Sequence, residues 1–235
     1  MITVNPNVNR GVIIAGIVIA FIIQIIFLIL PSLFYTSPKS SGIESMFVFS
    51  RMLLWLSLLV MNLYSVKVEK QSFFLKEEKK YSFGFYILSI VLLIVISLIM
   101  SAIVGITLKI TGLSSEKSQS MTRMIHVFSE RKWLIYFAVF TAGIMEELMF
   151  RVYLLSRLEL IFKNKYLPVI ISSVLFGLIH FGYGTVQNIV LPIFMGVLFS
   201  LYYIRYRNIK VLIITHFLWD LILVSASVYY YSQKQ

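Results

Sequence analysis

The chain has 235 residues, of which 59% are apolar, and it carries a formal net charge of +11. This composition excludes a disordered chain and an ordinary soluble domain, and it indicates an integral membrane protein. The sequence contains no cysteine, which excludes disulfide bonds, thiolate metal sites and a cysteine nucleophile. The basic residues flank apolar segments, which favours contacts with anionic lipid headgroups and argues against a nucleic-acid partner.

Seven apolar segments predict an all-α fold, a polytopic transmembrane helical bundle. A membrane-spanning helix needs about 20 mostly apolar residues, and five segments reach this length: 11–33, 46–66, 83–108, 133–156 and 210–230. Two further segments, 167–181 and 189–204, are shorter. Because they are too short for full exposure to lipid, we expect them to pack inside the bundle.

The first apolar segment, Gly11 to Leu30, differs from a signal peptide. Its apolar run is longer than the roughly 7–15 residues of a signal-peptide core, and no small-x-small cleavage site follows it. We therefore predict that this segment is a retained first span.

The basic residues also predict the orientation of the spans. Cytoplasmic loops carry an excess of lysine and arginine. With a cytoplasmic N-terminus, the inner side holds Arg10, Lys67, Lys70, Lys76, Lys79, Lys80, Arg157, Lys163, Lys165, Arg205, Arg207 and Lys210. The outer side then holds Lys39, Lys109, Lys117, Arg123, Arg131, Lys132 and Lys234. The larger inner set favours a cytoplasmic N-terminus and an outer C-terminus.

A polar connection, 109–132, separates the third and fourth spans. Met121, Met124, Ile125 and Phe128 recur at helical spacing within it and predict a short surface helix. We interpret it as a simple connecting helix; the alternative is a helix that contacts lipid or a partner.

The segment from Glu146 to Arg151 places three ionisable side chains inside an apolar stretch. Each costs roughly 2.5–3.5 kcal/mol at the membrane centre, so such groups usually pair, bind a ligand or take part in chemistry. Glu147 and Arg151 are i,i+4 neighbours in the favourable order, and we expect them to neutralise each other and orient the site. Glu146 lies about 100° away around the helix and is left free to act.

Two more patches carry histidine. Phe176 and His180 share one face of the helix expected over 167–181, followed by Gly182 and Gly184, which permit a turn or a close approach to a ligand. An isolated histidine on an apolar helix is often a hydrogen-bonded core residue, but a membrane location favours a functional role.

The third patch runs from His216 to Asp220, which also share a face. Asp220 is expected to orient the imidazole or to act beside it. Trp219 is interpreted as a core or interface residue, and His126, in a polar connection, receives no role.

The depths of the three patches agree with a single site. At 1.5 Å per residue, Glu146, His180 and His216 lie ~15, ~21 and ~10 Å from the inner ends of their helices. We therefore expect one shared cavity in the inner half of the membrane. Its carboxylates and imidazoles can activate water, with Glu146 as general base and a histidine to orient the water or to protonate the leaving amine.

The roles of the remaining histidine and Asp220 stay open at this point. They either stabilise the developing oxyanion or complete a metal site, with a divalent ion such as zinc and water in the open position. The candidate metal ligands are Glu146, His180, His216 and Asp220.

Read in order, Glu-Glu-x-x-x-Arg, Phe-x-x-x-His and His-x-x-x-Asp resemble the signature of the CPBP family of intramembrane proteases. This family comprises the type II CAAX prenyl endopeptidases and the bacterial bacteriocin-processing and immunity proteins, also called Abi. The resemblance covers about residues 133–225. It divides the chain into N-terminal transmembrane segments with polar loops, 1–132, and a catalytic helical core of four spans, 133–235.

The resemblance implies peptide-bond hydrolysis in a cavity open toward the cytoplasm. Carried over by position, Glu146 is the catalytic carboxylate, Glu147 and Arg151 support it, and His180 is the second catalytic group. His216 and Asp220 form the third motif, and Phe176 lines the site as a substrate-binding residue. The last motif position is usually Asn in eukaryotic-type members. An ionised Asp220 cannot donate to an oxyanion, which favours metal coordination or histidine orientation at this position.

The compact, cysteine-free and lysine-rich chain favours a bacterial peptide or signal-precursor substrate over a prenylated CAAX protein. We expect a role in bacteriocin processing, immunity or peptide signalling in a bacterial cytoplasmic membrane. Two alternatives remain: a non-catalytic membrane scaffold or immunity protein, and a proton-coupled transporter. For the transporter, the helix-breaking candidates Pro168 and Pro192 are weak support.

Overall fold

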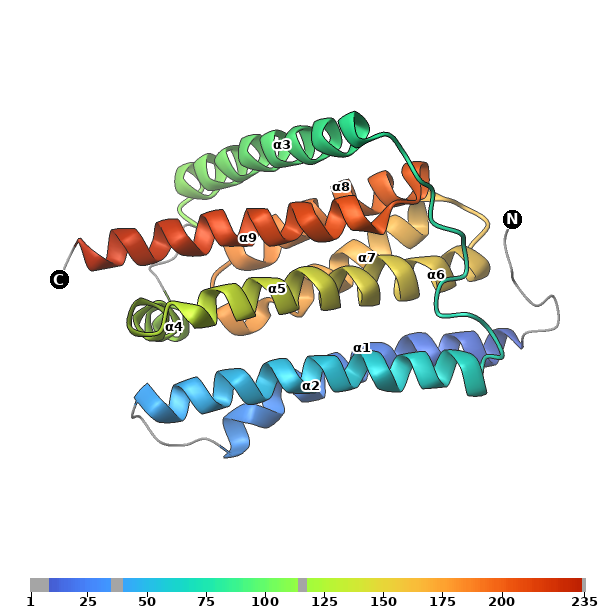
Figure 1. The fold of residues 1–235 in the computed structure, drawn as a ribbon, viewed down its shortest axis with the longest axis horizontal. Helices are drawn as coiled ribbons and strands as arrows, with labels where there is room; N and C mark the ends of the chain where they lie inside the picture. Colours follow the sequence, from blue (N-terminus) through green and yellow to red (C-terminus); the bar gives the residue numbers. More distant parts are fainter. Residues whose placement is uncertain (1–8, 35–39, 114–117, 234–235) are drawn as a thin grey trace.

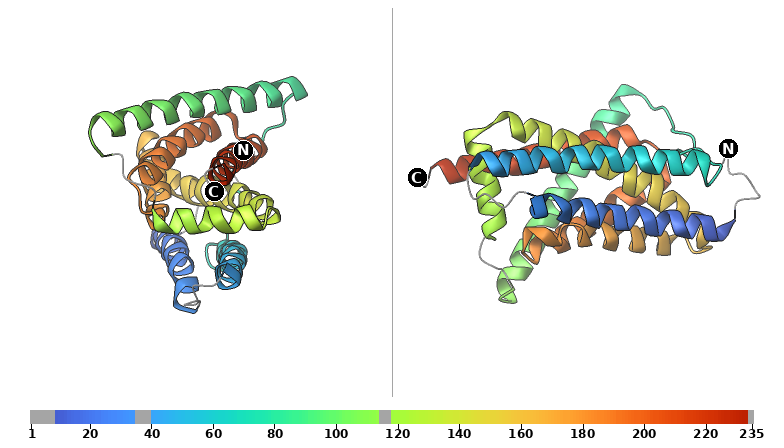
Figure 2. Two further views of the ribbon diagram at one scale, coloured as in Figure 1. Left: turned by 90° about the vertical axis from the view of Figure 1, so that its left-hand side faces the viewer. Right: turned by 90° about the horizontal axis from the view of Figure 1, so that it is seen from below.

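A computed structural model describes residues 9–34, 40–113 and 118–233. Most of the long helices lie roughly along one direction and form a bundle; α3 crosses this direction, and the short helix α4 lies across one end (Figures 1 and 2). The elements are α1 (Arg10–Phe34), α2 (Ser40–Lys67), α3 (Phe83–Ile110), α4 (Gln119–Glu130), α5 (Trp133–Glu147), the π-helix η1 (Leu148–Leu155), α6 (Ser156–Ile161), α7 (Tyr166–Leu178), the 3₁₀ turn η2 (Phe181–Tyr183), α8 (Gln187–Tyr206) and α9 (Ile209–Ser232).

Seven of the described helical segments are long and apolar enough to cross a membrane. The predicted all-α transmembrane bundle is therefore confirmed. The spans are Arg10–Phe27, Gly42–Lys67, Phe83–Ile110, Trp133–Ile161, Tyr166–Tyr183, Gln187–Tyr206 and Ile209–Ser232. Three residues used for the orientation, Lys39, Lys117 and Lys234, lie outside the described residues.

The centre of the bundle is the fourth span, formed by α5, η1 and α6. Within the bundle 61% of this span is buried, against 33% for Tyr166–Tyr183 and 28% for Gln187–Tyr206. The expectation that the two short segments pack inside is therefore wrong, since they are about as exposed as the other outer spans. The physical reason is charge: the fourth span carries the ionisable side chains, and these require partners on several sides.

Close backbone packing sets the position of α5 against α9. A Cβ atom added at Gly143 would lie 3.2 Å from the Ile213 carbonyl oxygen and 3.2 Å from the Phe217 nitrogen. Only glycine leaves room for the two backbones to approach this closely. This contact lies one turn from Glu146 on α5 and beside His216 on α9, and it brings two of the three motifs together.

The first three spans cover the core on opposite sides. The helices α1 and α2 pack against each other and against the fourth span, whereas α3 packs across α8 and α9 (Figures 1 and 2). Many large apolar side chains of α3 face outward, including Leu88, Ile99 and Ile103. The expected division of the chain into N-terminal transmembrane segments, 1–132, and a catalytic core, 133–235, stays a prediction.

A polar strap, residues 68–82, closes the end of the bundle opposite α4 (Figure 1). The backbone nitrogen of Lys79 donates to the Arg207 carbonyl at 2.7 Å, and the Asn208 amide donates to the Lys79 carbonyl at 2.8 Å. Glu78 accepts from the Tyr203 hydroxyl at 2.7 Å and from the backbone nitrogen of Ile209 at 2.6 Å. These hydrogen bonds fix the strap to the end of α8 and the start of α9.

A second cluster ties the strap to α6. Lys76 pairs with Glu159 at 2.8 Å, and Arg207 donates to the same carboxylate at 3.0 Å. Partial burial lowers the pKa of Lys76, and the hydrogen bond that Lys76 donates to Glu159 offsets part of that effect. In this cluster two basic side chains at the strap end of the bundle share one carboxylate.

Arg157, which is fully buried, is the centre of the contact between the strap and the core. Its guanidinium donates to Glu69 at 2.9 Å, to the Ser72 carbonyl at 2.9 Å and to the Phe73 carbonyl at 2.7 Å. Glu69 also accepts from the Tyr153 hydroxyl at 2.7 Å. The charge is therefore both paired and hydrogen-bonded, which is the condition under which a buried ion is tolerated.

We expect Glu69→Gln to destabilise the protein by about 3–5 kcal/mol, because it leaves the Arg157 charge buried without its carboxylate. Denaturant unfolding in detergent, followed by circular dichroism, measures the effect. Glu77→Gln is the matched control, because Glu77 lies in the same strap and is exposed, whereas Glu69 is buried. Equal stability of the Glu69 variant and the wild type would contradict the assigned role.

Candidate active site

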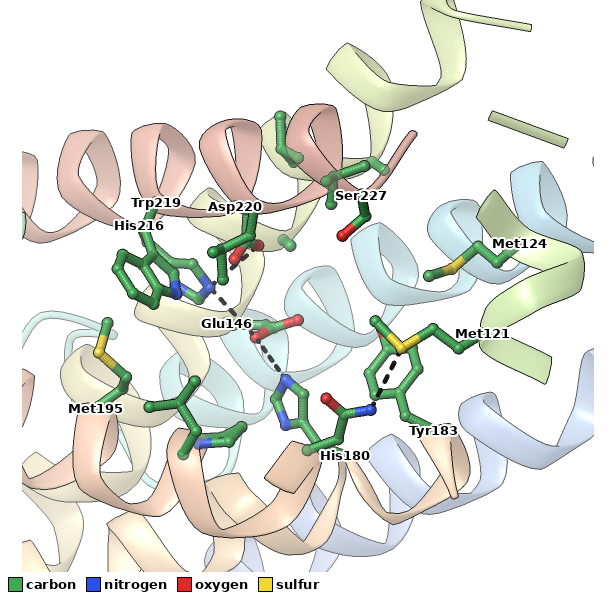
Figure 3. Close-up of a pocket in the computed structure, with 18 of the residues that line it drawn as sticks. Met121, Met124, Glu146, His180, Tyr183, Met195, His216, Trp219, Asp220 and Ser227 are labelled. Carbon is green, nitrogen blue, oxygen red and sulfur yellow. Dashed lines mark hydrogen bonds and ion pairs between the residues drawn. The ribbon is translucent and has the colours of Figure 1, made fainter. Parts of the chain in front are cut away.

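The three sequence motifs meet at one cavity (Figure 3). Its wall is built from α2, α4, α5, α7, α8 and α9 and from the turn between α7 and α8. The lining is mostly apolar, and it includes the ionisable or hydrogen-bonding side chains of Arg51, Glu146, His180, Tyr183, Gln187, Asn188, His216, Trp219, Asp220 and Ser227. This mixture is typical of a binding site.

Glu146 lies between the two histidines (Figure 3). Its Oε2 atom is 3.8 Å from His180 Nε2 and 3.8 Å from His216 Nε2. The same oxygen is buried and makes no hydrogen bond with any described residue. Both distances are too long for direct hydrogen bonds and leave the carboxylate available for a bound molecule.

The partner of each Nδ1 atom fixes the orientation of its imidazole ring. His180 Nδ1 lies 2.8 Å from the Phe176 carbonyl oxygen, which only accepts, so this nitrogen carries the proton. His216 Nδ1 lies 2.8 Å from Glu147 Oε1 and donates to that carboxylate. In both rings Nε2 therefore faces the cavity, on the side of Glu146.

Asp220 flanks the cavity side of His216. Its Oδ2 atom is 3.4 Å from His216 Nε2, and its side chain is 28% exposed. The sequence predicted that Asp220 either orients the imidazole or acts beside it. His216 Nδ1 donates the hydrogen bond that orients its ring to Glu147, on another helix, and Asp220 lies beside Nε2.

Glu147 and Arg151 are completely buried and lie 3.2 Å apart, so the predicted i,i+4 pair is confirmed. The Arg151 guanidinium also lies over the Phe176 ring, 4.4 Å from its centroid, and near Phe199, at 5.6 Å. Aromatic faces attract a desolvated cation. Phe176 therefore lines the cavity and also stabilises the charge behind it.

The π-helix η1 begins directly after the two glutamates. Such local widening is frequent at functional sites. It includes Arg151, whose guanidinium nitrogens have no hydrogen bond to the described residues. Arg151 is therefore held by charge and by aromatic rings, and no sequence pattern indicated the change of helix type.

A metal ion bound by the described residues is the other prediction for this site. No group of three or more His, Asp or Glu side chains among them is placed to hold one. The nearest contacts among the candidate ligands are 3.4 Å from His216 to Asp220 and 3.8 Å from each histidine to Glu146. The metal site stays a prediction, and no step of the chemistry below depends on it.

Several cavity residues were missed by sequence reasoning. Arg51 on α2, Tyr183 after His180 and the Met121 and Met124 side chains of α4 all line the wall. The apolar spacing in α4 was visible, but its interpretation as a simple connecting helix is incomplete, because α4 covers one end of the cavity. His126 is exposed on α4, 3.8 Å from Glu130, and lies outside the cavity wall.

The direction of the cavity differs from the expectation. From Glu146 it extends toward α4, and no residue of the polar strap lines it. The expected position, in the half of the bundle on the strap side, is wrong because the strap and the Arg157 network fill that end. With a cytoplasmic N-terminus, the cavity would lie in the half of the bundle away from the cytoplasm.

Residues 128–222 match the family model of the type II CAAX prenyl endopeptidases described as Rce1-like. No curated protein matches the chain, and no solved structure matches it. The match supports a CAAX-type intramembrane protease at the level of the family. The resemblance to the CAAX protease family is thereby confirmed for residues 128–222, the segment that contains all three motifs.

Proposed function

We propose that this protein is an intramembrane endopeptidase in which Glu146 activates a water molecule. The observation that carries the proposal is the unpaired, buried Glu146 oxygen, flanked at 3.8 Å by the Nε2 atoms of His180 and His216. A water molecule between these groups has a carboxylate to accept its proton and two imidazoles to orient it.

The reaction is the addition of water across a peptide bond. Glu146 takes one proton from water, and the resulting hydroxide adds to the carbonyl carbon. The proton then passes to the leaving nitrogen, directly or through His180, as the carbon–nitrogen bond breaks. His216, when it carries a proton on Nε2, donates to the developing oxyanion. An ionised Asp220 only accepts, so its contribution is to hold the His216 ring or a bound water.

Glu147 and Arg151 position the catalytic groups. Glu147 is hydrogen-bonded to His216 at 2.8 Å, and Arg151 balances the Glu147 charge at 3.2 Å. This arrangement keeps the ring of His216 directed at the cavity. The polar strap closes the opposite end of the bundle, and this closure argues against a continuous path for a transported ion.

The proposed substrate is an apolar peptide or membrane-protein segment, because the cavity wall is mostly apolar. A bacterial peptide or signal precursor fits this chemistry without a prenyl group. Processing of bacteriocins, immunity and peptide signalling are the proposed settings. A divalent metal stays a proposal that a chelator tests, and a scaffold without catalysis is the outcome if cleavage is not found.

We expect Glu146→Gln to lower kcat for a quenched fluorescent peptide by about 10²–10⁴-fold, because the amide cannot accept a proton from water. The assay uses purified protein in liposomes, with and without a chelator; retained cleavage in the chelator would oppose a metal-dependent step. Glu130→Gln, on the exposed face of α4, is the control. Equal cleavage by wild type and Glu146→Gln, with both folded, would refute the proposal.

The two carboxylates beside His216 should behave differently. We expect Glu147→Gln to lower stability by about 3–5 kcal/mol, because it leaves Arg151 buried without its counter-charge. Asp220→Asn, at a partly exposed position, should stay folded and lose less than about tenfold in kcat, since its amide oxygen still accepts. Thermal unfolding and the peptide assay separate the two effects; similar losses in both variants would contradict this division of roles.

We further propose that the N-terminus is cytoplasmic in a bacterial membrane, because the strap end carries most of the basic residues. The cavity then lies in the half of the bundle away from the cytoplasm. Since the chain has no cysteine, Lys80→Cys and Arg123→Cys give one thiol at each end. In intact cells a membrane-impermeant maleimide should label Arg123→Cys only. Labelling of Lys80→Cys alone would reverse the orientation.

A further inference from the structure

Arg51 is a charged residue of the cavity wall that the proposed chemistry does not use. It lies on α2, nine residues after the start of the span Gly42–Lys67, or ~14 Å along the helix. An arginine at such a depth is costly unless it has a partner or a function. Its side chain faces the cavity, so extension toward the lipid headgroups does not account for it.

The contacts of Arg51 leave its charge unbalanced. The guanidinium lies over the Phe47 ring, 4.8 Å from the centroid, and beside the Tyr183 hydroxyl. Its Nε atom is buried and makes no hydrogen bond with any described residue. Within the described part of the chain, no carboxylate forms an ion pair with it; Glu44, on the same helix, pairs with Arg131 at 3.5 Å.

The cavity therefore has opposite charges in two places. Glu146 and Asp220 lie at the histidines, and Arg51 lies on the α2 wall, with apolar side chains such as Met124 and Phe128 also in the lining. The side-chain amides of Gln187 and Asn188 add hydrogen-bonding groups to that lining. Such a wall accepts an apolar chain that carries one negative group.

Tyr183 lies between the histidine region of the cavity and Arg51. Its ring lies 5.7 Å from the His180 ring, and its hydroxyl reaches Arg51. An extended peptide advances about 3.3–3.6 Å per residue. A negative group bound at Arg51 would consequently lie only a few residues from the peptide bond beside Glu146.

We propose that Arg51 is a specificity-determining residue that binds a carboxylate of the peptide substrate, a few residues from the cleaved bond. The inference rests on the proposed protease function and names the substrate class: an apolar segment with one carboxylate. That carboxylate is either an acidic side chain or the free C-terminus of the segment. Guanidinium and carboxylate form two parallel hydrogen bonds, which gives both affinity and direction.

Peptide binding tests the inference without turnover. The Glu146→Gln protein in detergent is titrated with fluorescent apolar peptides that differ only in Glu or Gln at one position, each with a free or an amidated C-terminus. We expect the favoured carboxylate peptide to bind about 10–150-fold more tightly than its amide counterpart. The two peptide series identify which carboxylate is read. Equal Kd values for all four peptides would overturn the inference.

Variants of Arg51 assign the preference to this residue. In the Glu146→Gln background, Arg51→Gln should abolish the carboxylate preference, Arg51→Lys should keep part of it, and Arg51→Glu should transfer it to a lysine-containing peptide. Arg123→Gln, an exposed arginine of α4 outside the cavity wall, is the control and should bind as its parent does. A preference that survives Arg51→Gln would overturn the inference.

Cleavage by the protein with Glu146 intact separates this inference from the proposed function. Cleavage of the carboxylate and amide peptides at equal kcat/KM would refute the role of Arg51 and leave the protease standing. A carboxylate preference in binding, without cleavage of any peptide, would support Arg51 as the recognition residue and refute the protease. If Arg51→Gln does not fold, the comparison of the four peptides on the parent protein and on Arg51→Lys still decides the matter.

Discussion

The burial of charge on the fourth span is the constraint on which the rest of the structure depends. Glu147, Arg151 and Arg157 are buried on one continuous helix, and each needs a partner of opposite charge or a polar group. Those partners come from other elements: His216 on α9, the aromatic rings of α7 and α8, and Glu69 on the strap. The span is central because only that position lets all of them reach it.

The same constraint makes the two ends of the bundle different. At the strap end, Arg157 and its hydrogen bonds fill the space between the helices, and that end contains no part of the cavity wall. At the other end α7 stops early, with Leu178, and the chain turns through Gly184 at a φ of 74° into α8. Because α7 ends at this point, the cavity can extend as far as α4. A longer α7 would occupy that space.

Much of this arrangement could be predicted from the sequence, because it depends on spacing within single helices. The spans follow from apolar length, and the pair of Glu147 and Arg151 follows from the i,i+4 rule. The partner of His216 could not be predicted, since Glu147 lies 69 residues away on another helix. The same holds for Arg157, whose partner Glu69 is 88 residues away, and for Arg51, whose place in the cavity depends on how α2 packs.

Two carboxylates lie beside His216: Glu147, in the first motif, and Asp220, at the last position of the third motif. They lie in different surroundings, so the two positions place different requirements on the side chain. Glu147 is completely buried, accepts a hydrogen bond from His216 Nδ1 at 2.8 Å and balances the charge of Arg151. Asp220 is partly exposed, and at 3.4 Å from Nε2 it provides an oxygen beside the cavity. An asparagine has an oxygen at the same place. A position that needs only an acceptor tolerates Asp or Asn, whereas a position that neutralises a buried arginine does not.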